Sequence, residues 1–201
     1  MSFRVYNEDW KKKYLQPGVE SRMWDLILDE PLNNVASFPF LTPEVCSYFI
    51  EQAETYGKWT EGRHEYYPTY DMLLKDAGLH DLWESLMDDY VHEIAKGFYE
   101  LEGEKWDRMH IEPFIVKYEP RKQPALDFHH DYANYSTILT LNKNFTGGGT
   151  YFKKFKYLHK GNPGDLCIHP GEITHKHAAR PVLTGTRYII VTFCRNGDYG
   201  K

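Results

Sequence analysis

The feature that most constrains the fold is a change in hydrophobic period near residue 106. Before this point apolar residues recur at helical spacing; after it they form short β-branched or aromatic runs separated by Gly, Pro and Asn turns. The runs are HIEPFIVKYEP, YSTILTLN, GGGTYFKKF, GDLCIHPG and RYIIVTFC. Such a succession predicts an antiparallel sandwich or barrel over residues 106–195. We therefore expect one α+β domain, with helices from the N-terminal half packed outside the sheets.

Helical patterns occupy residues 40–105. The run EVCSYFIEQAETYG begins after a turn, and Pro43 stands at its first helical position, where proline is favoured. Its expected apolar face comprises Val45, Phe49, Ile50 and Ala53. A second helix is predicted in LHDLWESLMDDYVHEIAKGFY and ends near Gly97. Its expected apolar stripe comprises Leu79, Leu82, Leu86, Tyr90 and Ile94.

The N-terminal stretch and the bulk composition limit the domain organisation and the classes of function that the chain can have. Residues 1–22 are polar and charged, and we interpret them as a lead-in or linker before a domain spanning 23–201. With 41% hydrophobic and 16% aromatic residues, the chain can build a core. A net charge of −5 gives no reason to expect nucleic-acid binding, and no apolar run is long enough for a membrane span. Three cysteines without CxxC spacing predict buried free thiols.

Two neighbouring histidines and an aspartate in ALDFHHDYANYS suggest a metal site. In an extended strand residues i and i+2 point to the same face, so His129 and Asp131 can converge on one ion while His130 points away. An imidazole with a carboxylate suits a divalent metal that accepts nitrogen and oxygen ligands. The pair alone is a weak signal, because His-x-Asp occurs by chance in many proteins.

A second stretch, HPGEITHKHAARPVLTGTRYIIV, strengthens this interpretation. It supplies a distal histidine, either His175 or His177, which share the same parity along a strand. Ten residues after His177, Arg187 opens an apolar strand. A buried arginine is costly unless it meets an anion, and its planar fork suits a carboxylate. Two histidines and one aspartate form the facial triad of non-haem Fe(II) oxygenases, and Arg187 would hold the far end of a dicarboxylate co-substrate.

With these motifs the chain resembles the C-terminal catalytic domain of the procollagen lysyl hydroxylases, which are Fe(II)- and 2-oxoglutarate-dependent dioxygenases. The resemblance covers roughly residues 23–195. It rests on YGKWTEGRHE, PTYDM, VKYEPRKQPALDFHHD, NFTGGGTYF, HPGEITHKH and PVLTGTRYIIVTF, in that order. It departs from the family where Glu-Gly commonly follows the distal histidine, because Ala178-Ala179 stand here, and in a shorter loop after Arg63-His64-Glu65.

The resemblance implies a double-stranded β-helix (jelly-roll) core and a role for each site residue. His129, Asp131 and His177 are the expected iron ligands, because the family's spacing to the arginine favours His177 over His175. Arg187 is expected to pair with the far carboxylate of 2-oxoglutarate, and Tyr118 to donate its hydroxyl to the co-substrate. Thr140 is a further hydrogen-bonding candidate. The cofactors implied are Fe(II), 2-oxoglutarate and O2, with ascorbate as reductant.

The reaction implied is hydroxylation of a peptidyl lysine at C5 in a collagen-like chain, coupled to oxidative decarboxylation of 2-oxoglutarate to succinate. The expected reception site for the lysine ammonium includes Asp127, Tyr132 and Tyr135. The resemblance also implies a homodimer with Ile173 near the contact, upstream domains in a longer protein, and work in the endoplasmic reticulum lumen. Three alternatives remain open: a prolyl or other protein hydroxylase, a catalytically silent jelly-roll binding module, and a zinc hydrolase on a similar fold.

Several residues fall outside this constellation. We expect His130 to be a packing partner or part of a substrate rim. The histidines with no assigned ligand role are interpreted as mainly structural, with an accessory metal site as the alternative; they include His80, His92, His110 and His169. Gly147-Gly148-Gly149 lacks the following helix and lysine of a phosphate loop, so we interpret it as a turn between strands.

Overall fold

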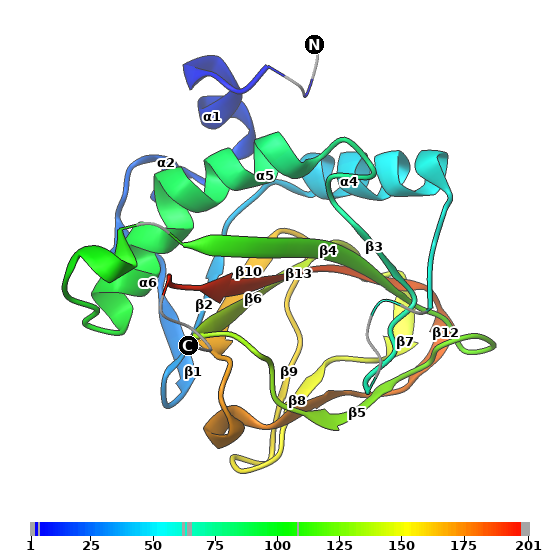
Figure 1. The fold of residues 1–201 in the computed structure, drawn as a ribbon. Helices are drawn as coiled ribbons and strands as arrows, with labels where there is room; N and C mark the ends of the chain where they lie inside the picture. The colour runs from blue at the N-terminus through cyan, green and yellow to red at the C-terminus, as the bar shows by residue number, and fades with distance from the viewer. Residues whose placement is uncertain (1–2, 4, 62, 64–65, 108, 198–201) are drawn as a thin grey trace.

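The main element of the fold is a seven-stranded antiparallel sheet. The computed structural model describes residues 3, 5–61, 63, 66–107 and 109–197. The strands lie in the order β1-β2-β10-β6-β13-β4-β3. Their bounds are β1 Asp29–Leu32, β2 Val35–Pro39, β3 Asp71–Leu73, β4 His110–Tyr118, β6 Tyr135–Thr140, β10 Asp165–Pro170 and β13 Arg187–Arg195. The two longest strands, β4 and β13, pair antiparallel (Figure 1). Arg187 on β13 and Tyr118 on β4, two residues of the candidate site, lie opposite each other in this pair.

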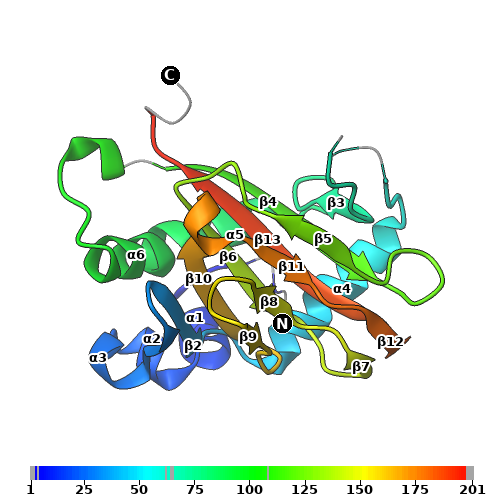
Figure 2. The ribbon, with the colours of Figure 1, turned by 90° about the horizontal axis from the view of Figure 1, so that it is seen from below.

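A smaller sheet faces the first one. It has four antiparallel strands in the order β5-β11-β8-β9, and β12 with β7 forms a separate two-stranded ribbon. The bounds are β5 Leu126–His129, β7 Phe145–Gly147, β8 Thr150–Phe152, β9 Tyr157–His159, β11 His177–Ala179 and β12 Val182–Gly185. Figure 2, seen from below, shows these short strands lying across the longer strands of the main sheet. The predicted antiparallel sandwich over residues 106–195 is confirmed, although the main sheet also recruits β1, β2 and β3 from the N-terminal half.

Side chains alternate between the two faces of the main sheet, as strand geometry requires. Ile190 belongs to the core that packs under the helices, whereas its neighbour Ile189 belongs to a second apolar cluster between the sheets. The second cluster also holds Phe114 and Val116 on β4 and Ile138 on β6. The inner face is therefore apolar apart from the few polar side chains that form the site.

Helices cover the outer face of the main sheet (Figure 1). They are α4 Pro43–Tyr56, α5 His80–Leu86, the π-helical turn η1 Met87–Val91 and α6 His92–Phe98. The predicted start of α4 at Pro43 is confirmed, and the helix ends at Gly57, whose φ of 68° suits glycine. The second predicted helix is interrupted by the π turn, which shifts the helical phase. Trp83, absent from the predicted stripe, precedes this turn. It lies four residues after Leu79 and three before Leu86 on the same face of α5, is fully buried, and donates its indole N–H to Thr192 Oγ1 at 2.9 Å.

The structure corrects the interpretation of residues 1–22 as a lead-in. This stretch forms α1 Glu8–Tyr14 and α2 Pro17–Glu20, and α3 Trp24–Ile27 follows. Trp10 and Tyr14, one helical turn apart, are 4% and 3% exposed and belong to the helix-side core, as does Val19. Charged residues dominate the composition of EDWKKKY, but Glu8, Asp9, Lys12 and Lys13 are exposed while the aromatic pair is buried. A linker would not bury such side chains.

Two short 3-10 turns complete the described elements: η2 Glu104–Trp106 and η3 Ile173–His175. The prediction of free buried cysteines is confirmed, since Cys46, Cys167 and Cys194 are buried and unbridged. Within the described ranges, none of the helices combines the length and apolarity needed to cross a membrane.

Candidate metal centre and active site

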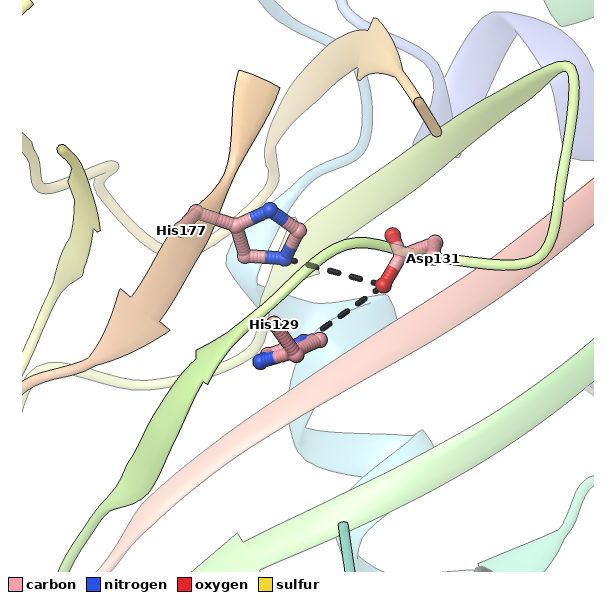
Figure 3. Close-up of side chains that lie close together, drawn as sticks. All are labelled: His129, Asp131 and His177. Carbon is pink, nitrogen blue, oxygen red and sulfur yellow. Dashed lines mark ion pairs between the residues drawn. The ribbon is translucent and has the colours of Figure 1, made fainter. Parts of the chain in front are cut away.

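Three side chains converge at the edge of the smaller sheet (Figure 3). His129 ends β5 and His177 begins β11, and the two residues are direct partners across these antiparallel strands. Asp131 lies just beyond β5 and turns back toward both. Its Oδ1 is 3.4 Å from His129 Nε2 and 3.7 Å from His177 Nε2. One ligand atom from each residue lies within 4.8 Å of the other two, so the three can hold a metal ion.

Backbone hydrogen bonds fix which nitrogen of each imidazole faces this point. His129 Nδ1 lies 2.7 Å from the Asp127 carbonyl and His177 Nδ1 lies 3.0 Å from the His175 carbonyl. A carbonyl oxygen only accepts, so both Nδ1 atoms carry the hydrogen, and in the neutral rings both Nε2 atoms direct a lone pair at the carboxylate. Without a metal, Asp131 opposes the effect of burial on His129 and raises the pKa of its imidazole, which lets Nε2–H donate to the carboxylate instead. Two lone pairs facing an anion repel it unless a cation lies among them. The donor set therefore fits a divalent metal, with the tautomers already set for coordination.

The ionisation states favour metal binding as well. Burial lowers the pKa of His177 to about 3, so its imidazole is neutral near pH 7. Burial opposes ionisation of Asp131, but the neighbouring histidines outweigh it and hold the pKa of the carboxyl well below its usual value. A neutral imidazole and an ionised carboxylate are the forms that bind metals.

Arg187 is a buried cation without a carboxylate partner in the described part of the chain. It opens β13, lies opposite Tyr118 of β4 in the sheet register, and is 4% exposed. Its guanidinium carbon is 5.5 Å from the centre of the Tyr118 ring. Its one described hydrogen bond, from Nη2 to Thr150 Oγ1, measures 3.4 Å, and Nη1 has no partner. Burial lowers the pKa of Arg187 and raises that of Tyr118 to about 12, so the phenol keeps its proton and can donate it to an anion.

A cavity of about 500 Å³ opens from the three convergent residues to the surface. Tyr118 and Thr150 line its inner wall, whereas Tyr66, Tyr67 and Tyr132 stand near its mouth with exposed fractions of 83%, 40% and 63%. Tyr67 also contacts the metal-facing histidine, with its ring centre 5.3 Å from that of His129. The cavity thus joins a polar inner end to an aromatic rim.

Arg187 lines a second cavity of about 450 Å³, and its hydrogen bond to Thr150 sets it at the partition between the two. Thr140, the further hydrogen-bonding candidate from the sequence, lines this second cavity and is absent from the wall of the first. Thr140 therefore shares a cavity with Arg187, and Thr150, which was not singled out from the sequence, contacts the guanidinium directly. The sequence does not distinguish the two threonines, because β propensity accounts equally well for both.

The structure separates His177 from its competitor. His175 ends the turn η3, and its Nε2 lies 3.0 Å from the Asn33 carbonyl, away from Asp131. The assumption that His175 and His177 share one strand is therefore wrong, because β11 begins only at His177. His130 is exposed and lines the cavity mouth, which agrees with its expected place on a rim.

Among the expected lysine-reception residues, Tyr135 must be corrected. It is 2% exposed and its hydroxyl lies 2.5 Å from His92 Nδ1, on the helix side of the main sheet. It begins a strand whose alternate residues face opposite sides, and its parity directs it outward. Tyr132 does line the cavity, whereas Asp127 is exposed and outside the lining set.

The other motifs have simpler outcomes. The glycine run begins at the last residue of β7 and ends just before β8, and Gly147, Gly148 and Gly149 all have positive φ, which agrees with a turn between strands. Ala178 and Ala179 are buried in β11 beside β8. In the shortened loop, Arg63 Nε and Nη1 each lie 2.7 Å from a carboxylate, of Asp71 and of Glu112 respectively. His64 and Glu65 of this motif lie outside the described residues.

The histidines without an expected ligand role lie in different surroundings. His80 is part of an i,i+4 pair with Glu84, His92 packs on Tyr135, and His110 is exposed. His169 is different, because it is fully buried and lines the main cavity beside Asp131. The sequence offered no signal for this position beyond the residue type.

Comparisons with known proteins bear on this geometry. The multifunctional procollagen lysine hydroxylase and glycosyltransferase LH3 of Rattus norvegicus is 31% identical over 199 residues, covering 92% of this chain and 27% of the relative. The procollagen lysyl hydroxylase and glycosyltransferase of Acanthamoeba polyphaga mimivirus is 33% identical over 203 residues, covering 92% and 22% respectively. The chain is a homologue of the procollagen lysyl hydroxylases. This lysyl hydroxylase homologue spans about a quarter of the length of the curated relatives it matches. No family model matches it.

Solved structures identify the fold of this lysyl hydroxylase homologue. A Pseudomonas putida prolyl-4-hydroxylase superposes with a TM-score of 0.61 at 14% identity, covering 81% of this chain and 92% of that one. The collagen prolyl hydroxylase of Paramecium Bursaria Chlorella virus-1, in its 2-oxoglutarate complex, gives 0.56 at 15% identity, covering 82% and 96%. The expected jelly-roll core with helices outside it is confirmed.

Proposed function

We propose that the chain is an Fe(II)- and 2-oxoglutarate-dependent dioxygenase that hydroxylates peptidyl lysine at C5 in collagen-like sequences. The observation that carries the proposal is the convergence of two tautomer-fixed histidines on Asp131, in a cavity that ends near an unpaired buried arginine. A metal alone would use the triad but leave Arg187 without an anion. A dicarboxylate co-substrate accounts for both.

Each residue then has a defined task. His129, Asp131 and His177 would hold the iron, and all three line the cavity through which the co-substrate would reach it. The unpartnered Nη1 of Arg187 receives the far carboxylate of 2-oxoglutarate, and the Tyr118 hydroxyl donates a hydrogen bond to the same molecule. When bound, iron, 2-oxoglutarate and O2 supply the oxidising chemistry, with release of succinate and CO2. Ascorbate is the reductant we assign to turnovers without substrate.

The aromatic side chains at the mouth of the cavity support lysine as the substrate residue. Asp71, a carboxylate close to the cavity, is fully buried and already paired with Arg63, so it is not available to a substrate cation. Tyr66 and Tyr67 instead offer exposed rings, to which an ammonium group is attracted through the ring quadrupole. The Tyr132 ring already has a cation beside it, the Arg195 guanidinium carbon 5.9 Å from its centre. A polyproline-II chain presents its side chains outward, so a lysine can enter while its backbone stays at the mouth.

The substrate assignment is tested with two collagen-like peptides that differ in one residue. Wild-type protein with Fe(II), ascorbate and 2-oxoglutarate is expected to release succinate in excess of the peptide-free control with a Gly-x-Lys peptide, but not with its Gly-x-Pro counterpart. Asp131→Ala is expected to abolish the release. Succinate formation driven by the proline peptide would favour the prolyl hydroxylase alternative. Peptide hydrolysis without O2 would favour a zinc hydrolase, and absence of turnover with iron bound would favour a silent binding module.

We further propose that the chain works as a homodimer with Ile173 at the contact, in the lumen of the endoplasmic reticulum. Ile173 is 69% exposed although apolar, and it begins η3, the turn just before the ligand His177. A contact at this turn would couple assembly to the position of His177.

The dimer proposal is tested by Ile173→Asp, with Leu183→Asp as matched control because Leu183 is similarly exposed at 66% but lies on β12. Sedimentation is expected to give monomers, with reduced turnover, for the first variant only. An Ile173→Asp protein that remains dimeric and active would contradict the proposal.

A further inference from the structure

His169 is a third buried imidazole at the metal centre, and the triad does not account for it. It lies in β10 opposite Ser136 of β6, is 0% exposed, and faces the space between the sheets. Its Nε2 is 3.9 Å from Asp131 Oδ2, and its ring centre is 4.7 Å from that of His177. Neither His169 Nε2 nor Ser136 Oγ has a hydrogen-bond partner among the described residues.

The tautomer of His169 follows from its other nitrogen. Nδ1 lies 2.9 Å from the Pro170 carbonyl, which can only accept, so Nδ1 carries the hydrogen. In the neutral ring Nε2 then presents a lone pair to the cavity, facing the Oδ2 lone pairs of Asp131. Two acceptors that face each other in a buried site need a donor between them, because an unsatisfied buried acceptor is costly.

His169 is not placed to be a fourth ligand. The group whose ligand atoms all lie within 4.8 Å of one another contains His129, Asp131 and His177 but not His169. The two oxygens of Asp131 also face different residues: Oδ1 faces His129 and His177, and Oδ2 faces His169. A water molecule that donates one hydrogen to each of two acceptors separates them by roughly 4 to 4.5 Å. The separation of 3.9 Å between Nε2 and Oδ2 is close to this span.

We propose that His169 is a positioning residue that, with Asp131 Oδ2, accepts the two hydrogens of a water molecule in the coordination shell of the metal. The proposal rests on the metal site of the proposed function and adds to it. By engaging Oδ2 through this water, His169 keeps Asp131 bound through Oδ1 alone. The carboxylate then occupies a single coordination position and leaves the remainder for the co-substrate.

The test uses Mn²⁺ alone as the probe, so it does not depend on hydroxylation. Calorimetry measures the Mn²⁺ dissociation constant, and water-proton relaxation measures water bound to the ion. His169→Leu removes the acceptor, and its Mn²⁺ affinity is expected to fall by about 10- to 100-fold with weaker relaxation enhancement. His169→Gln offers an amide oxygen near the place of Nε2 and is expected to restore most of both signals. His92→Leu is the control, because His92 is a partly buried histidine on α6, away from the candidate metal centre, whose Nε2 also has no hydrogen-bond partner; this variant is expected to bind Mn²⁺ like wild type.

Three results would overturn the inference. They are wild-type affinity and relaxation in His169→Leu, equal losses in the Leu and Gln variants, and equal losses in His92→Leu. If His169→Leu does not fold, nitrogen-15 NMR of histidine-labelled wild type decides instead. The inference requires the Nδ1–H tautomer of His169 and a smaller Nε2 shift on Zn²⁺ addition than those of His129 and His177. Wild-type protein that binds no Mn²⁺ would contradict the proposed function itself, whereas normal binding by both wild type and His169→Leu would contradict only this inference.

Discussion

Replacing Arg187 by methionine should make the unliganded protein more stable while abolishing its response to 2-oxoglutarate. The guanidinium is 4% exposed, has no carboxylate partner among the described residues, and makes one hydrogen bond of 3.4 Å to Thr150. That bond contributes about 1.5 kcal/mol or less. Desolvation of an ion costs several kcal/mol, and replacement of buried ionic groups by apolar residues of similar volume is often neutral or stabilising by about 1 to 4 kcal/mol. The net expectation for Arg187→Met is a gain of about 1 to 3 kcal/mol.

Binding of 2-oxoglutarate is expected to reverse the order of stability of wild type and Arg187→Met. With Mn²⁺ present and 2-oxoglutarate at 100 times its dissociation constant, wild type should gain about 2.7 kcal/mol, whereas Arg187→Met should gain little. In a chain of this size each kcal/mol shifts the unfolding temperature by roughly 2 to 4 °C, so thermal unfolding with and without 2-oxoglutarate resolves both effects. Arg180→Met is the matched control, because Arg180 is exposed beyond β11 and its loss should change stability by about 0.5 kcal/mol or less.

Two results would refute this reasoning about Arg187. A loss of stability in unliganded Arg187→Met would mean that the guanidinium already has a strong partner. A normal thermal shift with 2-oxoglutarate would mean that the co-substrate does not use Arg187.

Three further predictions concern the rim, the histidines and the N-terminal helices. Tyr66→Ala should raise the KM for a lysine peptide about two- to fivefold, from about 0.5 to 1 kcal/mol of lost cation–π contact, while Tyr66→Phe stays close to wild type. An unchanged KM in Tyr66→Ala steady-state kinetics would contradict this role. Burial lowers the pKa of His92 to about 4, so as pH falls below about 6.5 the unfolded chain takes up this proton first and stability is lost, by about 2 kcal/mol at pH 5. In urea titrations from pH 7 to 4, His92→Gln should therefore lose less stability than wild type, and an equal loss would refute the assignment. Trp10→Ala should cost about 3 to 5 kcal/mol in the same assay at pH 7, and a loss below about 1 kcal/mol would restore the interpretation of α1 as a lead-in.

The parts of the fold that could be predicted are those where local pattern and burial agree. β4, β6, β10 and β13 are runs of apolar and β-branched residues between clear turns, and α4 has Pro43 at its start and Gly57 at its end. The meeting of His129 and Asp131 could be predicted from side-chain parity and residue chemistry, although β5 already ends at His129. Parity did not separate His175 from His177, and the family resemblance favoured His177.

What could not be predicted depends on contacts between distant parts of the chain. The strand β3 is three residues long and exists because it pairs with β4, and the buried face of α1 is defined by the core beneath it. The π turn η1 follows α5 and changes the helical phase before α6, which a fixed period does not anticipate. Tyr67 reaches the site from 62 residues before His129, a separation that carries no local signal. His169 lies only eight residues before His177, but the two belong to different sheets, so their spacing does not predict that they meet.

The most direct test of the central claim is to follow both products of one turnover under isotopically labelled O2. Wild-type protein is incubated with Fe(II), ascorbate, 2-oxoglutarate and a Gly-x-Lys collagen peptide, and the peptide and succinate are analysed by fragmentation mass spectrometry. The account predicts one labelled oxygen on the lysine side chain at C5, one in succinate, and neither in Asp131→Ala. Labelled succinate with an unmodified lysine would contradict the lysyl hydroxylase assignment, and absence of label from both products with iron bound would contradict the dioxygenase itself.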